Sequence, residues 1–219
     1  MTQLRSSLRG TSLALYPGCS VASLSLALVA AHLTAGPAQA EGPGDDGRWL
    51  AGAYSYSDDL GGFRIVSIRG SGTADDPVEL SQEFDSASPV TLTIRAEKPI
   101  RLRGVPSAEV ATGMIHLRIV TINGSGLPWI EFEFELQEQP GEASTYGDGL
   151  SFDQRRQHAE QLSSDSLEEY RRDFEPHDRV LFTGGVIDPG RSGQFDMFIT
   201  DFTPKRTFYL KQDPRAPYS

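Results

Sequence analysis

The stretch Ile130-Glu131-Phe132-Glu133-Phe134-Glu135-Leu136 alternates apolar and acidic side chains without a break. Successive side chains of a β-strand point to opposite faces of a sheet, so this pattern predicts a strand with one apolar face and one carboxylate face. An apolar strand face has to be covered by another layer of the protein. The stretch therefore predicts a layered β fold.

The segment before it, residues 114–122, also alternates and places His116 and Arg118 between apolar residues. The two runs flank residues 123–128, Asn-Gly-Ser-Gly-Leu-Pro, which are typical of a turn. A hairpin that matches the two apolar faces would set Arg118 and His116 opposite two of the three glutamates. Opposite charges across an antiparallel pair contribute on the order of 0.2–1 kcal/mol each, so burial and charge both favour this hairpin.

Similar short runs recur along the chain, separated by clusters of Gly, Pro, Asp and Ser. We predict strands at 63–69, 78–83, 90–95, 100–103, 114–122, 129–138, 180–183, 194–200 and 207–211. Their number and spacing predict a mainly β fold, an antiparallel β-sandwich of immunoglobulin-like or jelly-roll-like type. The last run ends at Asp213-Pro214, and because proline cannot donate to a ladder we expect it to be an edge strand.

Residues 151–174 depart from the alternating pattern. Apolar residues are sparse there and are spaced by three to five positions, and Glu168 and Arg172 form an i to i+4 pair. Such spacing is typical of an exposed amphipathic helix, for which Ser164 or Asp165 can act as N-cap. We therefore predict a helical insertion at about 151–174 between two strands.

The first forty residues have the three parts of a secretory signal peptide. A polar stretch with Arg5 and Arg9 as its only charges precedes an apolar run at 21–31, and the segment ends at Ala38-Gln39-Ala40. Signal peptidase accepts small residues three and one before the cut. The apolar run is well short of the roughly twenty residues of a membrane-spanning helix. We predict a cleaved leader at 1–40, no integral membrane segment after cleavage, and a periplasmic or secreted product.

The predicted mature chain consists of a flexible lead-in at 41–48 and a single β-sandwich domain at 49–219. Cleavage removes Cys19, the only cysteine, which excludes disulfides, cysteine-ligated metals and thiol nucleophiles. It leaves eighteen basic and thirty acidic residues, a net charge of −12. Nucleic acid and anionic membrane surfaces are poor partners for such a chain, whereas cations, basic proteins and neutral glycans fit it.

The carboxylates of Glu131, Glu133 and Glu135 are the candidate catalytic groups. Glycoside hydrolysis needs two acids a few ångströms apart, and next-but-one side chains of a strand are about 7 Å apart. The chain lacks a Gly-x-Ser-x-Gly elbow and has neither His-x-x-x-His nor Glu-x-x-His. We favour the interpretation that the glutamates form a solvated outer face, neutralised by Arg118 and His116.

Acidic loops are the candidate metal sites, through Asp58, Asp59, Asp75, Asp76 and Asp148. Calcium takes six to eight oxygen ligands, and loop carboxylates of extracellular domains supply them. The spacing of an EF-hand loop is absent, and Asp-Gly and Asp-Pro pairs also form turns without a metal. Calcium is therefore the one cofactor that the sequence suggests.

Trp49, Tyr54 and Tyr56 are the candidate binding residues. Together with Phe63 they form an aromatic lead segment, which either presents a stacking surface to a glycan or protein or closes the core as a first strand. We favour closure of the core.

These features predict an exported acidic β-sandwich protein, a non-catalytic binding or structural module of the periplasm or cell surface with a protein or glycan partner. One alternative is a small secreted hydrolase that uses paired carboxylates on a carbohydrate or ester. The other is a calcium-binding extracellular domain.

Overall fold

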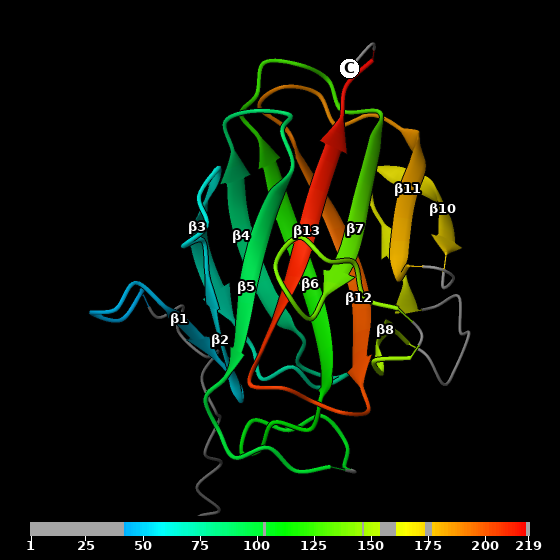
Figure 1. Ribbon diagram of the computed structural model, residues 1–219. Helices are drawn as coiled ribbons and strands as arrows, with labels where there is room; N and C mark the ends of the chain where they lie inside the picture. The colour runs from blue at the N-terminus through cyan, green and yellow to red at the C-terminus, as the bar shows by residue number, and fades with distance from the viewer. Residues whose placement is uncertain (1–41, 103, 146, 154–160, 174–176, 218–219) are drawn as a thin grey trace, which may run out of the picture. The chain divides into compact units, whose positions relative to one another are not determined.

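Thirteen strands build the structure of the protein, a computed structural model that describes residues 42–102, 104–145, 147–153, 161–173 and 177–217. The predicted leader at 1–40 and the first residue of the lead-in lie outside the described residues. The strands are arranged in two sheets, here called sheet A and sheet B (Figure 1).

Sheet A contains, in spatial order, β1 (Trp49–Ala51), β2 (Tyr54–Ser57), β5 (Val90–Ala96), β13 (Thr207–Arg215), β7 (Glu131–Gln137), β11 (Arg179–Gly185) and β10 (Leu167–Asp173). Sheet B contains β3 (Phe63–Arg69), β4 (Val78–Phe84), β6 (Met114–Asn123), β12 (Ser192–Asp201) and β8 (Leu150–Phe152), and β9 (Ser163–Ser164) also pairs with β12. The two sheets pack together around one apolar core, so the predicted mainly β sandwich is confirmed.

The strand pairs are antiparallel except for β4 and β6, which pair in parallel from Val78 opposite Leu117 to Phe84 opposite Asn123. Parallel neighbours need a crossover connection. Here β5, which follows β4 in the chain and lies in sheet A, is part of that crossover. The chain thus passes from sheet B to sheet A and back.

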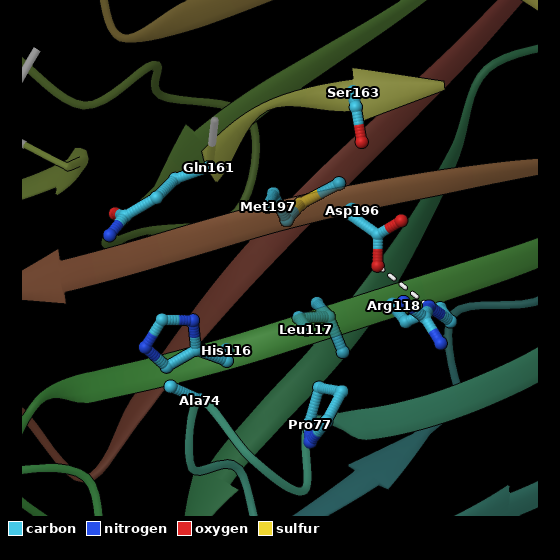
Figure 2. A pocket seen from close by; sticks show the side chains of 9 residues that line it. All are labelled: Ala74, Pro77, His116, Leu117, Arg118, Gln161, Ser163, Asp196 and Met197. Atoms are coloured by element: carbon cyan, nitrogen blue, oxygen red, sulfur yellow. Dashed lines mark hydrogen bonds and ion pairs between the residues drawn. The ribbon is translucent and has the colours of Figure 1, made fainter. Parts of the chain in front are cut away.

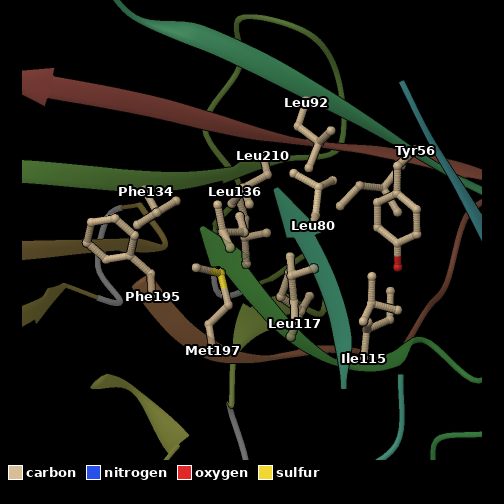
Figure 3. Close-up of a cluster of buried hydrophobic side chains, with 14 of the residues drawn as sticks. Tyr56, Leu80, Leu92, Ile115, Leu117, Phe134, Leu136, Phe195, Met197 and Leu210 are labelled. Atoms are coloured by element: carbon tan, nitrogen blue, oxygen red, sulfur yellow. The ribbon is translucent and has the colours of Figure 1, made fainter. Parts of the chain in front are cut away.

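The inner faces of the two sheets meet in the core (Figure 3). Phe195 of β12 lies among three rings from sheet A, with centroid distances of 4.7 Å to Phe132, 5.0 Å to Phe134 and 5.2 Å to Phe182. All four rings are buried. Aromatic pairs at such distances contribute about 0.5–1.5 kcal/mol beyond the burial of their area. The alternating runs therefore bury their apolar faces against each other across the sandwich.

A pair of buried amides also connects the two sheets. Gln82 of β4 and Gln212 of β13 are fully buried and exchange hydrogen bonds of 2.6 and 3.1 Å in both directions. The side-chain nitrogen of Gln82 also donates to the hydroxyl of Thr121 on β6 at 2.8 Å. Any other alignment of the sheets would leave these polar groups unpaired in the core, so the pair favours one alignment.

Most strands fall where the alternation predicted them, and β3 has the predicted bounds, Phe63–Arg69. The predicted strand at 100–103 does not form, because Ile100 makes only an isolated bridge to Ala111, and residue 103 lies outside the described residues. The short strands β8 and β9 were not predicted, whereas β1 and β2 lie in the aromatic lead segment that we expected to close the core as a first strand.

The predicted hairpin between residues 114–122 and 129–138 is wrong. β6 lies in sheet B between β4 and β12, whereas β7 lies in sheet A between β13 and β11. The buried side chain of Asn123 holds the connection in place by donating to the carbonyls of Leu127 and Ile187, each at 2.8 Å. The apolar faces of the two strands still meet, but across the core instead of within one sheet.

The predicted helical insertion at 151–174 is also wrong. The described residues of this range contain strands β8, β9 and β10, while 154–160 and 174 lie outside the described residues. β10 pairs with β11, and the ring of Tyr170 packs on that of Phe182 with centroids 6.0 Å apart. Arg172 does not pair with a helical neighbour but donates to the backbone carbonyl of Asp153 at 2.9 Å. These non-local contacts outweigh the helical spacing of the local sequence.

β13 is not the edge strand that Pro214 suggested, because it lies between β5 and β7. Its pairing with β5 stops at Gln212, whereas its pairing with β7 continues to Arg215. At Pro214 the strand therefore has one neighbour only, and the sheet tolerates the missing N–H there.

Candidate functional site

The three glutamates of β7 lie on the outer face of sheet A, where arginines neutralise them. Arg215 of β13 lies 3.3 Å from Glu131 and 3.0 Å from Glu133. Arg179 of β11 lies 2.5 Å from Glu135. The glutamates are thus neutralised by cations from the neighbouring strands of sheet A. The predicted neutralisation by Arg118 and His116 is wrong, because β6 lies in sheet B.

Glu135 is the most buried of the three, at 4% exposed. One of its oxygens faces Arg179, and the other accepts a 2.7 Å hydrogen bond from the side chain of Gln137. General acid–base catalysis needs a carboxyl group within reach of a substrate. With both oxygens engaged inside the sheet, Glu135 forms part of a structural charge network.

Two of the acidic loops close turns with their carboxylates. Asp58 accepts the backbone N–H of Ile65 at 2.9 Å. Asp148 accepts the hydroxyl of Ser144 and the backbone N–H of Thr145 and of Leu150 at 2.7 to 3.0 Å. The bond from Leu150 to Asp148 has the two-residue spacing by which aspartate forms turns without a metal, and the bond of Asp58 ties the loop between β2 and β3.

Asp59 is fixed on sheet A by hydrogen bonds from Thr93 at 2.7 Å and Arg95 at 2.5 Å. Burial acts to raise the pKa of Asp59, but hydrogen bonds from Thr93, Arg95 and Ser57, together with the charge of Arg95, outweigh burial and lower the pKa below its usual value. Asp59 is therefore held as a carboxylate by groups of the chain itself.

Asp75 and Asp76 are exposed in the turn between β3 and β4. The turn is closed by the backbone carbonyl of Asp76, which accepts the N–H of Ser71, Gly72 and Thr73 at 2.9 to 3.1 Å. Within the part of the chain that the structure describes, no three His, Cys, Asp or Glu residues form a group that could hold a metal ion.

Tyr54 and Tyr56 lie inside the sandwich, at 6% and 0% exposed. The hydroxyl of Tyr54 accepts the N–H of Gly113 at 3.0 Å, and burial raises the pKa of Tyr54 to about 12. Trp49 is partly buried against the same core. The two tyrosine rings close the core and present no stacking face to a ligand.

A polar groove lies on the outer face of sheet B, above β6 and β12 (Figure 2). We call it the His116 groove. Its volume of about 430 Å³ is typical of a small-ligand pocket. It is lined by Ala74, Pro77, His116, Leu117, Arg118, Gln161, Ser163, Asp196 and Met197. His116 and Arg118 extend from β6 and Asp196 from β12, so the polar side chains of the groove stand on strands of sheet B.

The ion pair of Arg118 with Asp196 is the charged centre of the groove. The two residues are opposite each other in the β6–β12 register, and Nε of Arg118 donates to Asp196 at 2.7 Å. The guanidinium also lies 4.0 Å from Glu79 on β4, and the second oxygen of Asp196 accepts from Gln194 at 2.9 Å. The positive charge is thus balanced, and the groove has no strong positive charge.

His116 connects this polar part of the groove to an apolar part. Its ring stacks on that of Phe198, with centroids 4.3 Å apart and planes inclined by 22°. Residues 104–106 and Met114 line the surface beside this stack. Because His116, Ala74 and Gln161 line both parts, the groove combines a planar apolar surface with hydrogen-bonding groups.

Burial lowers the pKa of His116, and the charge of Asp153 only partly opposes this shift. The imidazole is therefore neutral at pH 7.

The side-chain oxygen of Gln161 is buried and has no hydrogen-bond partner among the described residues. Asp153 has a φ of 46°, in the left-handed region that non-glycine residues seldom adopt. Buried polar atoms without partners and strained backbone both concentrate at ligand sites.

Sequence reasoning paired His116 and Arg118 with β7 and so missed their actual neighbours, Asp196 and Phe198. A signal for this pairing was present in the sequence. The alternation of β12 places Asp196 and Phe198 on the outer face, where their charge and ring complement those of β6. Which strand lies beside β6 is decided by the whole sandwich, and no local pattern specifies it.

No protein-family model, curated protein or solved structure matches this chain. In the ranges that the structure describes, no helix is both long enough and apolar enough to cross a membrane. The functional argument therefore rests on the geometry of the His116 groove.

Proposed function

We propose that this protein is an exported, non-catalytic binding module of the periplasm or cell surface, and that its His116 groove holds a neutral sugar unit of a glycan. The observation that carries the proposal is the junction of two surfaces at His116. An aromatic stack with apolar neighbours lies on one side, and a fixed ion pair lies on the other.

This combination suits the chemistry of a sugar. A pyranose ring has an apolar C–H face and a rim of hydroxyl groups that both donate and accept hydrogen bonds. The His116–Phe198 stack supplies planar apolar contact. Arg118 supplies donors, and the carboxylate of Asp196 supplies acceptors.

A neutral ligand is favoured by the charges around the groove. Arg118 is balanced by Asp196 and Glu79, so it offers little attraction to a phosphate or a uronic acid. The chain as a whole is acidic, with a formal net charge of −10, and it repels anions at a distance.

Binding is favoured over hydrolysis because the acidic group at the centre of the groove is already engaged. Cleavage of a glycosidic bond requires one carboxyl group that donates a proton and a second that attacks or activates water. Both oxygens of Asp196 accept hydrogen bonds, from Arg118 and from Gln194. This arrangement commits both carboxyl oxygens of Asp196 to hydrogen bonds within the protein and fixes them as acceptors.

The test is an array of neutral and anionic oligosaccharides probed with the purified exported protein, followed by calorimetric titration of the best ligand. Arg118→Met keeps an unbranched apolar stem but removes the donors of the guanidinium, and we expect it to weaken binding about tenfold to a hundredfold. Arg64→Met is the matched control, because Arg64 also pairs with a glutamate on the outer face of sheet B, Glu83, but does not line the groove.

The proposal fails if no neutral oligosaccharide binds, or if the two arginine variants bind equally well. It also fails if chromatography of the bound sugar after long incubation shows cleavage products, because the protein would then be a hydrolase.

A further inference from the structure

β10 (Leu167–Asp173) is the last strand of sheet A and pairs with β11 on one side. Among the described residues no strand pairs with its other side, and Figure 1 shows it at the margin of the sheet. An edge strand presents a row of backbone N–H and C=O groups that can pair with a strand of another chain. Its seven residues are longer than β1, the three-residue strand at the opposite edge of the same sheet.

The charges of β10 are arranged antisymmetrically about Tyr170. The sequence Glu168-Glu169-Tyr170-Arg171-Arg172 has two negative residues before the tyrosine and two positive residues after it. When such a strand pairs antiparallel with a second copy of itself, Tyr170 stands opposite Tyr170. Each glutamate then stands opposite an arginine of the other copy.

Charged residues on an edge strand normally prevent pairing, because like charges come together or charges become buried. In β10 the order of the charges favours pairing, but with one partner only. That partner is a second copy of β10 in antiparallel register. Opposite charges across an antiparallel pair attract, and two-fold symmetry makes every contact occur twice.

The exposure of the side chains supports this use of the edge. Glu169 and Arg171, which share one face of the strand, are both exposed, and Tyr170 is 37% exposed. Arg172 is half-buried and bonds the backbone carbonyl of Asp153, so it anchors the strand to the domain. The main cross-copy charges are therefore those of Glu169 and Arg171.

We propose that β10 pairs antiparallel with β10 of a second copy, centred on Tyr170, and joins two copies of sheet A into one continuous sheet. Glu169 of each copy then faces Arg171 of the other. The resulting dimer carries two His116 grooves, one on sheet B of each copy, and presents them together to a repeating ligand.

The test is a charge swap, followed by sedimentation velocity of the purified protein over a wide concentration range. We expect the unmodified protein to dimerise. Glu169→Arg alone places arginine opposite arginine, and Arg171→Glu alone places glutamate opposite glutamate. Each single variant is expected to dimerise about tenfold or more weakly than the unmodified protein.

An equimolar mixture of the two single variants restores both opposite-charge contacts, so we expect it to form a heterodimer. The double variant Glu169→Arg with Arg171→Glu restores the contacts within one chain and is expected to dimerise like the unmodified protein. Hydrogen exchange adds an independent readout, because amides of β10 become protected on dimerisation and lose this protection on dilution.

A monomer at all concentrations overturns the proposal. So does a dimer that both single variants leave unchanged, because its interface then lies elsewhere. A mixture of the single variants that stays monomeric while both remain folded by circular dichroism also overturns it.

Discussion

The buried pair of Gln82 and Gln212 leads to a quantitative prediction about how the two sheets hold together. These side chains belong to β4 and β13, in opposite sheets, and each amide donates to the other. Gln212→Met replaces one amide by an apolar chain of similar length. It leaves the side-chain oxygen of Gln82 buried without its donor, while the nitrogen of Gln82 keeps the hydroxyl of Thr121 as acceptor.

A buried acceptor without a donor costs about 1–3 kcal/mol, and we expect Gln212→Met to lower the free energy of unfolding by that amount. Gln82→Met has a similar cost, because it strands the amide of Gln212. The double variant removes both groups and should cost far less than the sum of the single changes. The coupling energy of this cycle should therefore be about 1–3 kcal/mol.

Denaturation by urea, followed by fluorescence and circular dichroism, measures all four proteins. Gln194→Met is the control, because Gln194 is only partly buried on the outer face of β12, and its loss should change the stability by about 0.5 kcal/mol or less. Single effects that simply add up would refute the reasoning, because the two amides would then not meet across the core.

Three further predictions concern charge. Burial raises the pKa of Asp201 from its usual value of 3.8 to about 6, so the folded protein holds this proton more tightly than the unfolded chain does. The free energy of unfolding should accordingly fall as pH rises from about 4 to about 6, and Asp201→Asn should flatten this fall in a pH series of urea titrations. Arg215→Met leaves Glu131 and Glu133 without a shared cation and should destabilise the protein by about 1 kcal/mol at low salt, an effect that added salt should reduce because screening weakens the repulsion. Excess calcium should leave the melting temperature measured in chelator unchanged, because carboxylates such as that of Asp148 already accept hydrogen bonds from the chain; a rise would establish a calcium site.

The sequence was a good guide to strands whose two faces differ in polarity. The run at β3 keeps its predicted bounds because alternation is a local property that one strand carries alone. The connection at 123–128 was misread because its turn residues suit both a hairpin and an arch between two sheets. In both arrangements the apolar faces of β6 and β7 are buried, so burial alone does not decide between them.

The error at β10 has a related cause. A spacing of four residues between Glu168 and Arg172 places both side chains on one face of a helix, but it also places them on one face of a strand. Residues 167–173 form a strand because Tyr170 contacts Phe182 and because β11 offers an edge with which they pair. Both interactions depend on residues from elsewhere in the chain.

The His116 groove was beyond local sequence reasoning for the same reason. It needs His116 from β6, Asp196 and Phe198 from β12 and Gln161 from a third segment. These residues become neighbours only when the order of strands in sheet B is established.

The central claim is that the His116 groove holds a neutral sugar, and nuclear magnetic resonance of the ¹⁵N-labelled protein, titrated with the best neutral oligosaccharide of the array, tests it most directly. We predict that the shifted amide signals concentrate in β6, in β12 and at residues 161–163. In the Arg118→Met variant the same shifts should need about tenfold to a hundredfold more ligand. Shifts that concentrate on the outer face of sheet A, around the glutamates of β7, or the absence of any shift would contradict the claim.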